Sequence, residues 1–173
     1  MPETVLGVDP GVSETGWAVL DIDERNAARL RAAGLIKTRP GPALPDRLRY
    51  IHAELARILG EHSPDSVAVE EMFFAKVANT IRNTLQARGV VLLSAAQANR
   101  PVSEYNPRTV KLTLTGSGQA EKAQMQTVVQ KALNLKERLT PDDVADAAAI
   151  ALCHARSGRF KRLKVLDSFG GKK

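Results

Sequence analysis

The sequence predicts an α/β fold with a mixed five-stranded sheet, from two patterns in the order of its elements. Three short runs rich in apolar and β-branched residues come first, over 4–8, 16–22 and 32–38, at spacings that suit antiparallel neighbours. Strand-like and helical segments then alternate from residue 44 onward, which is typical of α/β domains. The 173 residues are 43% hydrophobic and 25% charged, which is close to the globular average. We therefore exclude disordered and collagen-like classes and expect a single core.

Each predicted element depends on a local signal. The first run ends at an Asp-Pro-Gly turn, and three prolines mark the loop that follows the third run. Apolar side chains recur at helical spacing over 44–59, and the small, β-branched run 66–69 predicts a buried central strand that ends at Glu70-Glu71. We further predict a helix over 77–99 interrupted by Gly89, a strand over 101–105, and helices over 107–115 and 121–133. A last helix should run to about residue 156, with Thr140 as its N-cap and Pro141 at its first position.

Positive charge is concentrated in the middle and at the end of the chain. The net charge is +6, but residues 1–75 carry −4, residues 76–131 carry +6, residues 132–155 carry −2 and residues 156–173 carry +6. One interpretation is a solvated surface with a basic tail. The other is an acidic centre with basic flanks, as in proteins that hold phosphates beside metal-binding carboxylates. We predict one domain over 1–157 and a flexible basic tail over 158–173.

The sequence also suggests where the protein is found. Its single cysteine, Cys153, cannot form an internal disulfide, which fits a reducing cytosol or a thiol-poor secreted protein. No secretory segment opens the chain, and the longest apolar stretch, 89–98, is far shorter than the ~20 residues of a membrane helix. We therefore expect a cytoplasmic protein that does not associate with membranes.

Four carboxylates are candidates for chemistry. Asp9 and Glu70 end two predicted strands, and Asp143 and Asp146 lie three residues apart on one face of the last helix. Asp9 could instead form the turn, Glu70 could reach solvent, and Asp143 could cap the helix. Asp146 is different, because it lies past the first turn within an alanine-rich stretch, where an acid needs a charged partner.

A hard divalent cation is the partner that these oxygens favour. Mg²⁺ prefers carboxylate and water oxygens, and two such ions about 4 Å apart can promote phosphodiester cleavage. Two choices stay open on these grounds: Glu71 could replace Glu70, and spacing slightly favours Asp142 over Asp143. Zinc has no matching site, because the only cysteine and the three histidines are scattered along the sequence, at Cys153, His52, His62 and His154.

At GVDPGVSETGWAV the sequence resembles the RuvC family of bacterial Holliday-junction resolvases, which belong to the ribonuclease H-like superfamily. The resemblance continues, in order, through VAVEEMFFAKVANT, LQARGVV, NPRTVKLTLTGSGQAEKAQMQ and DDVADAAAIALCHA. It covers about residues 5–156. It implies a ribonuclease H-like fold, with three antiparallel strands followed by two parallel strands and flanked by helices.

The resemblance also implies the site residues. The family's metal-binding carboxylates fall on Asp9, Glu70, Asp143 and Asp146, although some members carry His where this chain has Asp143. A junction-contacting aromatic falls on Phe73, and basic residues near the active site fall on Lys111 and Lys122. Exposed aromatics can stack on opened bases and basic residues can bind phosphates, so we add weaker DNA-binding candidates, which are Phe74, Arg82, Arg88 and Arg108.

The resemblance implies a crossover junction endodeoxyribonuclease that functions in homologous recombination and DNA repair. The family acts on four-way DNA junctions as a homodimer that makes paired symmetric nicks with Mg²⁺, two ions per active site, for which Mn²⁺ could substitute. A RuvA–RuvB branch-migration complex is the implied partner. The apolar helix over 77–99 is a candidate dimer interface. Alternatives are a YqgF-type nuclease acting on RNA, one half of an actin- or hexokinase-like nucleotide binder, and a non-catalytic nucleic-acid-binding module.

Overall fold

The computed structural model confirms the predicted sheet. It describes residues 2–71 and 78–169, with the backbone alone in 78–83 and 158–169. The strand order is β3-β2-β1-β4-β5. Strand β2 is antiparallel to both β1 and β3. Strand β4 is parallel to both β1 and β5. The strands are β1 (Glu3–Asp9), β2 (Glu14–Ile22), β3 (Ala28–Lys37), β4 (Ser66–Glu70) and β5 (Val102–Tyr105).

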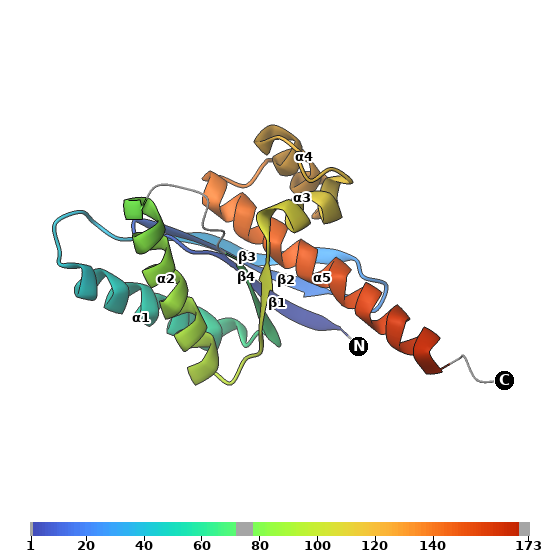
Figure 1. Ribbon diagram of the computed structural model, residues 1–173, viewed down its shortest axis with the longest axis horizontal. Helices are drawn as coiled ribbons and strands as arrows, with labels where there is room; N and C mark the ends of the chain where they lie inside the picture. The colour runs from blue at the N-terminus through green and yellow to red at the C-terminus, as the bar shows by residue number, and fades with distance from the viewer. Residues whose placement is uncertain (1, 72–77, 170–173) are drawn as a thin grey trace.

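The helices cover both faces of this sheet (Figure 1). Two of them, α1 and α2, enclose one apolar core against the sheet, and α3, α4 and α5 enclose a second core on the opposite face. The long helix α5 crosses the sheet directly over β1 and β2 (Figure 1). The helices are α1 (Leu44–His62), α2 (Ala78–Gln97), α3 (Pro107–Thr115), α4 (Lys122–Ala132) and α5 (Asp142–Phe169).

Two predicted helices differ from those observed. Helix α2 runs through Gly89 without a break, because one glycine costs a helix only about 1 kcal/mol and neighbouring apolar residues pack against the core. Helix α5 begins at Asp142, so Pro141 precedes its first residue, and it continues to Phe169 instead of ending near residue 156. The added segment contains no proline and several good helix formers. The flexible tail remains a prediction.

Because side chains alternate between the two faces of a strand, their order decides on which face of the sheet the last side chain of each strand lies. In β1, Leu6 and Val8 pack on the α1–α2 side, whereas Val5 packs on the α5 side. The next side chain on the α5 side after residues 5 and 7 is that of Asp9, at the end of the strand. In β4 the alternation likewise places Ala68, and therefore Glu70, on the α5 side. Within the part of the chain that the structure describes, no helix is both long and apolar enough to span a membrane.

Candidate active site

Asp9 and Glu70 lie side by side at one edge of the sheet. Strands β1 and β4 are parallel, and their paired residues end at Val8 and Val69, so each acid is the next residue along its strand. Both side chains are half-buried. Burial, and next the charges of Glu70, Asp146 and Asp143, raise the pKa of Asp9 to about 8. Burial followed by the charge of Asp146 also raises the pKa of Glu70. Glu71 is exposed, so the structure places Glu70, and not its neighbour, beside Asp9.

Helix α5 brings the other two carboxylates to this edge. Burial is the largest cause that raises the pKa of Asp146, and its charge raises the pKa values of both strand-end acids. Burial and then the charge of Glu14 raise the pKa of Asp143. Four carboxylates from β1, β4 and α5 therefore share one region, and their mutual repulsion favours a nearby cation.

Two glycines allow α5 to approach the strands this closely. A Cβ at Gly7 in β1 would lie 2.1 Å from the carbonyl oxygen of Ala147, and a Cβ at Gly16 in β2 would lie 2.0 Å from that of Asp143. No side chain larger than hydrogen fits either gap. Small residues on α5 complete the close contact, since Ala147 and Ala151 are fully buried. The backbone of α5 thus lies directly on the strands, which sets the depth of Asp143 and Asp146 in the site.

A hydrogen-bonded turn fixes the chain just after Asp9. The fully buried Thr15 donates its Oγ1 proton to the carbonyl oxygen of Gly11 over 2.7 Å, and the same Oγ1 accepts from the Gly11 amide over 3.3 Å. Next to it, Glu14 forms an ion pair of 2.8 Å with Lys37 and is close enough to Asp143 to raise the pKa of that acid. Sequence reasoning missed Glu14, because its position depends on the β2–β3 register and no local motif signals it.

Two lysines face the carboxylates, as the resemblance implies. Lys111 and Lys122 line a cavity of about 240 Å³ together with Glu70 and Asp146. The Nζ of Lys122 lies 3.9 Å from Asp146 Oδ2, and its charge lowers the pKa values of Asp146 and Asp9. The site therefore combines acids at the sheet edge with cations on α3 and α4. This is the acidic centre with basic flanks that was one interpretation of the charge distribution.

The slight preference that spacing gave to Asp142 is not supported by the structure. Its Oδ2 pairs with Lys122 Nζ at 2.9 Å, and its Oδ1 accepts a hydrogen bond from Gln126 Nε2 over 2.6 Å. The hydrogen bond from Lys122 is the main reason that the pKa of Asp142 is lowered. Asp142 therefore joins the start of α5 to α4, whereas Asp143 and Asp146, with raised pKa values, belong with the strand-end acids.

The donor set fits a hard divalent cation. Its groups are carboxylate oxygens, the ligands that Mg²⁺ and Mn²⁺ prefer. Because the pKa of the half-buried Asp9 is about 8, ionising this carboxyl group is unfavourable at neutral pH. A cation bound beside it would favour the ionised form. Among the described residues, no three His, Cys, Asp or Glu side chains are grouped closely enough to hold a metal ion, so the four carboxylates share this region without forming a preassembled ligand set.

The other predicted DNA-binding residues are Phe73, Phe74, Arg82, Arg88 and Arg108. Phe73 and Phe74 lie outside the described residues, and so does the side chain of Arg82. Arg88 forms an ion pair with Glu104 of β5, which links α2 to the sheet and uses its charge within the fold. Arg108 lies at the start of α3, where Asn106 caps its amide, and its aliphatic atoms pack against Gly118 in the turn between the two lysines.

Comparisons with known proteins identify the family of the chain. Residues 5–154 match the family model for crossover junction endodeoxyribonuclease RuvC. Proteins of that name from Chloroflexus aggregans and Alkaliphilus oremlandii are 46% and 43% identical over 87% and 92% of this chain, and over 91% and 96% of their own lengths. The structure of Thermus thermophilus RuvC in complex with a Holliday junction substrate is 37% identical, with a TM-score of 0.88 over 92% of this chain and 96% of that one.

A more distant structure shares the fold alone. The yeast mitochondrial Holliday junction resolvase Ydc2 is 15% identical, with a TM-score of 0.65 over 88% of this chain and 77% of that one. It supports the ribonuclease H-like arrangement of the sheet and helices. With the family match over residues 5–154 and relatives above 40% identity over most of their lengths, the chain belongs to the RuvC family of crossover junction endodeoxyribonucleases.

Proposed function

We propose that this protein is a divalent-metal-dependent endonuclease that resolves four-way DNA junctions by paired symmetric nicks. The observation that carries the proposal is the meeting of Asp9, Glu70, Asp143 and Asp146, from three elements distant in sequence, at one edge of the sheet. Structural needs do not explain such a cluster, because burial and the charges of the other three acids raise the pKa of Asp9, and burial and the charge of Asp146 raise that of Glu70. Family membership identifies the class of substrate on which the cluster acts.

The four carboxylates would hold Mg²⁺, or Mn²⁺ in its place. Two such ions would activate a water and stabilise the leaving oxygen of a phosphodiester. The chain's own part is to fix these acids at the ends of β1 and β4 and on α5. Lys111 and Lys122, which line the same cavity, would bind the phosphates beside the cleaved bond and hold the strand over the acids.

The remaining contacts to the junction belong to this proposal as well. Phe73 and Phe74 follow the end of β4 in sequence, and aromatic rings could stack on bases opened at the crossover. We expect Phe73→Ala to keep junction binding and to lose most cleavage. Unchanged cleavage would assign Phe73 to packing alone. The charges of Arg82 and Arg108 would make further phosphate contacts, whereas Arg88 is already paired with Glu104.

We further propose that the protein acts as a homodimer through α2. Paired nicks on a two-fold symmetric junction require two active sites, which a two-fold dimer supplies. Leu93 on α2 is 52% exposed, although most apolar neighbours on this helix pack inward. We expect Leu93→Asp to convert the dimer to a monomer in light scattering. A RuvA–RuvB branch-migration complex would deliver the junction.

The decisive experiment compares the parent protein with Asp146→Asn on a synthetic four-way junction in Mg²⁺ or Mn²⁺. We expect paired nicks near the crossover from the parent, and binding without cleavage from the variant. Equal cleavage by both proteins would reject the assigned site. Cleavage of RNA hairpins or plain duplex in place of the junction would support a YqgF-type activity instead.

A further inference from the structure

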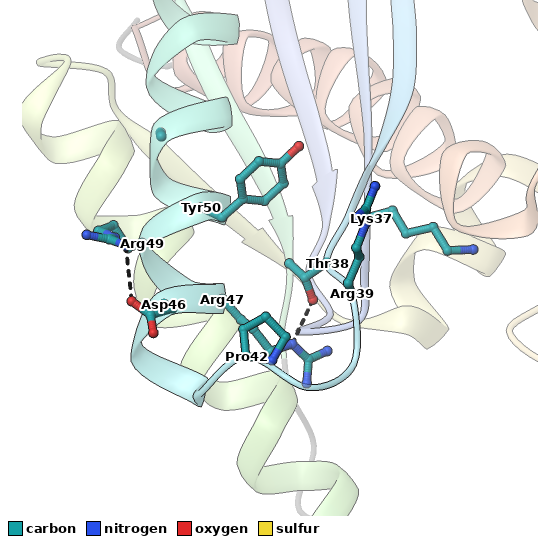
Figure 2. Close-up of a pocket in the computed structure, with 9 residues that line it drawn as sticks. Lys37, Thr38, Arg39, Pro42, Asp46, Arg47, Arg49 and Tyr50 are labelled. Carbon is teal, nitrogen blue, oxygen red and sulfur yellow. Dashed lines mark hydrogen bonds and ion pairs between the residues drawn. The ribbon is translucent and has the colours of Figure 1, made fainter.

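A second basic surface lies apart from the cavity of the carboxylates. A pocket of about 660 Å³ is formed between the segment that follows β3 and the first turns of α1 (Figure 2). Four of its residues are cationic and only one is acidic, so its lining is strongly positive. The charged lining residues are Lys37, Arg39, Arg47, Arg49 and Asp46.

The net charge of the long segment that contains these residues gives no sign of this basic surface. Residues 1–75 carry −4 in total, yet residues 37–49 contain four bases and one acid. The fold separates these bases from the acids of the same segment. Arg39 is exposed and makes no hydrogen bond or ion pair with the residues that the structure describes. Arg49 is also exposed and pairs only with Asp46, at 3.1 Å, within the described part of the chain. Two guanidinium groups are therefore available to a ligand.

The floor of the pocket is well ordered by hydrogen bonds. Arg47 donates through Nε to Thr38 Oγ1 over 2.8 Å and through Nη2 to Ser13 Oγ over 3.0 Å. Thr38 in turn donates its hydroxyl proton to the carbonyl oxygen of Val12 over 2.6 Å. Residues 12 and 13 belong to the turn that follows Asp9. The pocket is thus built directly against the loop of the active site.

An ion pair connects a residue that lines the pocket to the neighbourhood of the carboxylates. Lys37 lines the pocket and pairs with Glu14 at 2.8 Å, and the charge of Glu14 raises the pKa of Asp143. Lys37 ends β3 at the same edge of the sheet at which Asp9 ends β1. With one strand between them and Lys37 two residues beyond the position opposite Asp9, these two strand ends are separated by about 12 Å. A nucleic-acid strand at the carboxylates would reach the pocket within a few nucleotides.

We propose that this pocket binds the DNA backbone of a junction arm, two or more nucleotides from the cleaved phosphate. The inference rests on the proposed function. Arg39 and Arg49 bind phosphate oxygens, for which guanidinium groups are well suited. Tyr50, which is 49% exposed, and Pro42 provide an apolar wall on which a deoxyribose can pack. Figure 2 shows Tyr50 extending from α1 toward the segment that carries Arg39, and Arg49 beside Asp46 on the same helix.

The test measures binding of the full chain to a fluorescent four-way junction in EDTA over a series of salt concentrations. We expect the double variant Arg39→Ala/Arg49→Ala to bind about tenfold more weakly and to reduce the slope of log K against log[salt] by about 2, since each phosphate contact contributes about 0.9. Tyr50→Ala should weaken binding and leave the slope unchanged, because it removes no charge. With Mg²⁺ and saturating protein, the double variant should cleave bound junction at the parent's rate.

Arg29→Ala is the matched control. Arg29 is likewise exposed, makes no hydrogen bond or ion pair with described residues, and lies near the opposite end of β3 from the pocket. Its loss should leave both affinity and slope nearly unchanged. If the double variant behaves like Arg29→Ala while the parent binds and cleaves junctions, the pocket serves another ligand, such as an acidic protein segment, and this inference is overturned. If the parent itself neither binds nor cleaves junctions, the proposed function has failed instead.

Discussion

Gly16 and Asp143 are in direct contact through the backbone: a Cβ on Gly16 would lie 2.0 Å from the Asp143 carbonyl oxygen. Gly16 also pairs with Asp9 across the β1–β2 ladder. One glycine therefore sets the distance between an acid at a strand end and an acid on α5. The proposed metal site depends on that distance, because metal ligands must converge within a fraction of an ångström.

We expect Gly16→Ala to move the start of α5 away from β2. The substitution should cost about 1–3 kcal/mol of unfolding free energy and reduce junction cleavage more than junction binding. Urea denaturation and single-turnover cleavage measure the two effects. Gly60→Ala in α1 is the control, since no atom lies within 4 Å of a Cβ there, and it should raise stability by about 0.5–1 kcal/mol. Cleavage by Gly16→Ala at the parent's rate would contradict this role.

Adjacent acids at the end of β4 offer a matched pair of variants. Glu70→Gln should abolish most cleavage and reduce the rise in melting temperature that Mg²⁺ produces, because Glu70 faces Asp9 and Asp146. Glu71→Gln should leave both properties unchanged, since Glu71 is exposed. Thermal unfolding at several Mg²⁺ concentrations provides the measurement. Equal effects of the two variants would remove Glu70 from the proposed ligand set.

The raised pKa of Asp9 predicts how stability depends on pH without metal. The pKa of Asp9 is about 8 in the folded protein, against 3.8 for an unperturbed aspartate. At pH values between these two, the folded state therefore binds a proton on Asp9 that the unfolded state does not bind. The contribution of Asp9 to stability is therefore fully present below about pH 4 and is lost as pH rises through 8. In EDTA, we expect Asp9→Asn to show a smaller loss of stability than the parent between about pH 5 and pH 8, when urea denaturation is measured at both.

Lys122 compensates part of the negative charge in the site. Because it lies 3.9 Å from Asp146 and pairs with Asp142, Lys122→Ala should slow cleavage and reduce the salt dependence of junction binding by about one phosphate contact. Lys131→Ala, which removes a charge from the exposed end of the same helix, serves as the control. The two variants would be compared in junction binding and single-turnover cleavage, and the same result from both would argue against a specific role for Lys122.

The sequence by itself determined the fold class and most of the element boundaries, because these depend on local signals. Apolar and β-branched runs predicted the five strands, although β3 begins at Ala28, four residues before its predicted start. Helix α3 was predicted at its observed bounds, since Asn106 and Pro107 mark its start and Gly116 its end. Asp146 could also be identified from sequence, because an acid within an alanine-rich helix needs a charged partner. Two interpretations were wrong for local reasons: Gly89 does not break α2, and α5 does not end near residue 156.

Residue spacing left open which acids meet; the family resemblance implied a choice, and the tertiary structure brings Asp9, Glu70, Asp143 and Asp146 to one edge of the sheet. Residue spacing could not separate Glu70 from Glu71 or Asp143 from Asp142; strand alternation and the pairing of Asp142 with Lys122 did so. The basic pocket beside α1 was also invisible in sequence, because it lies within a segment of net negative charge. The physical reason is common to these cases: local structure follows from neighbours along the chain, whereas a site depends on contacts across it, such as that of Gly16 with Asp143.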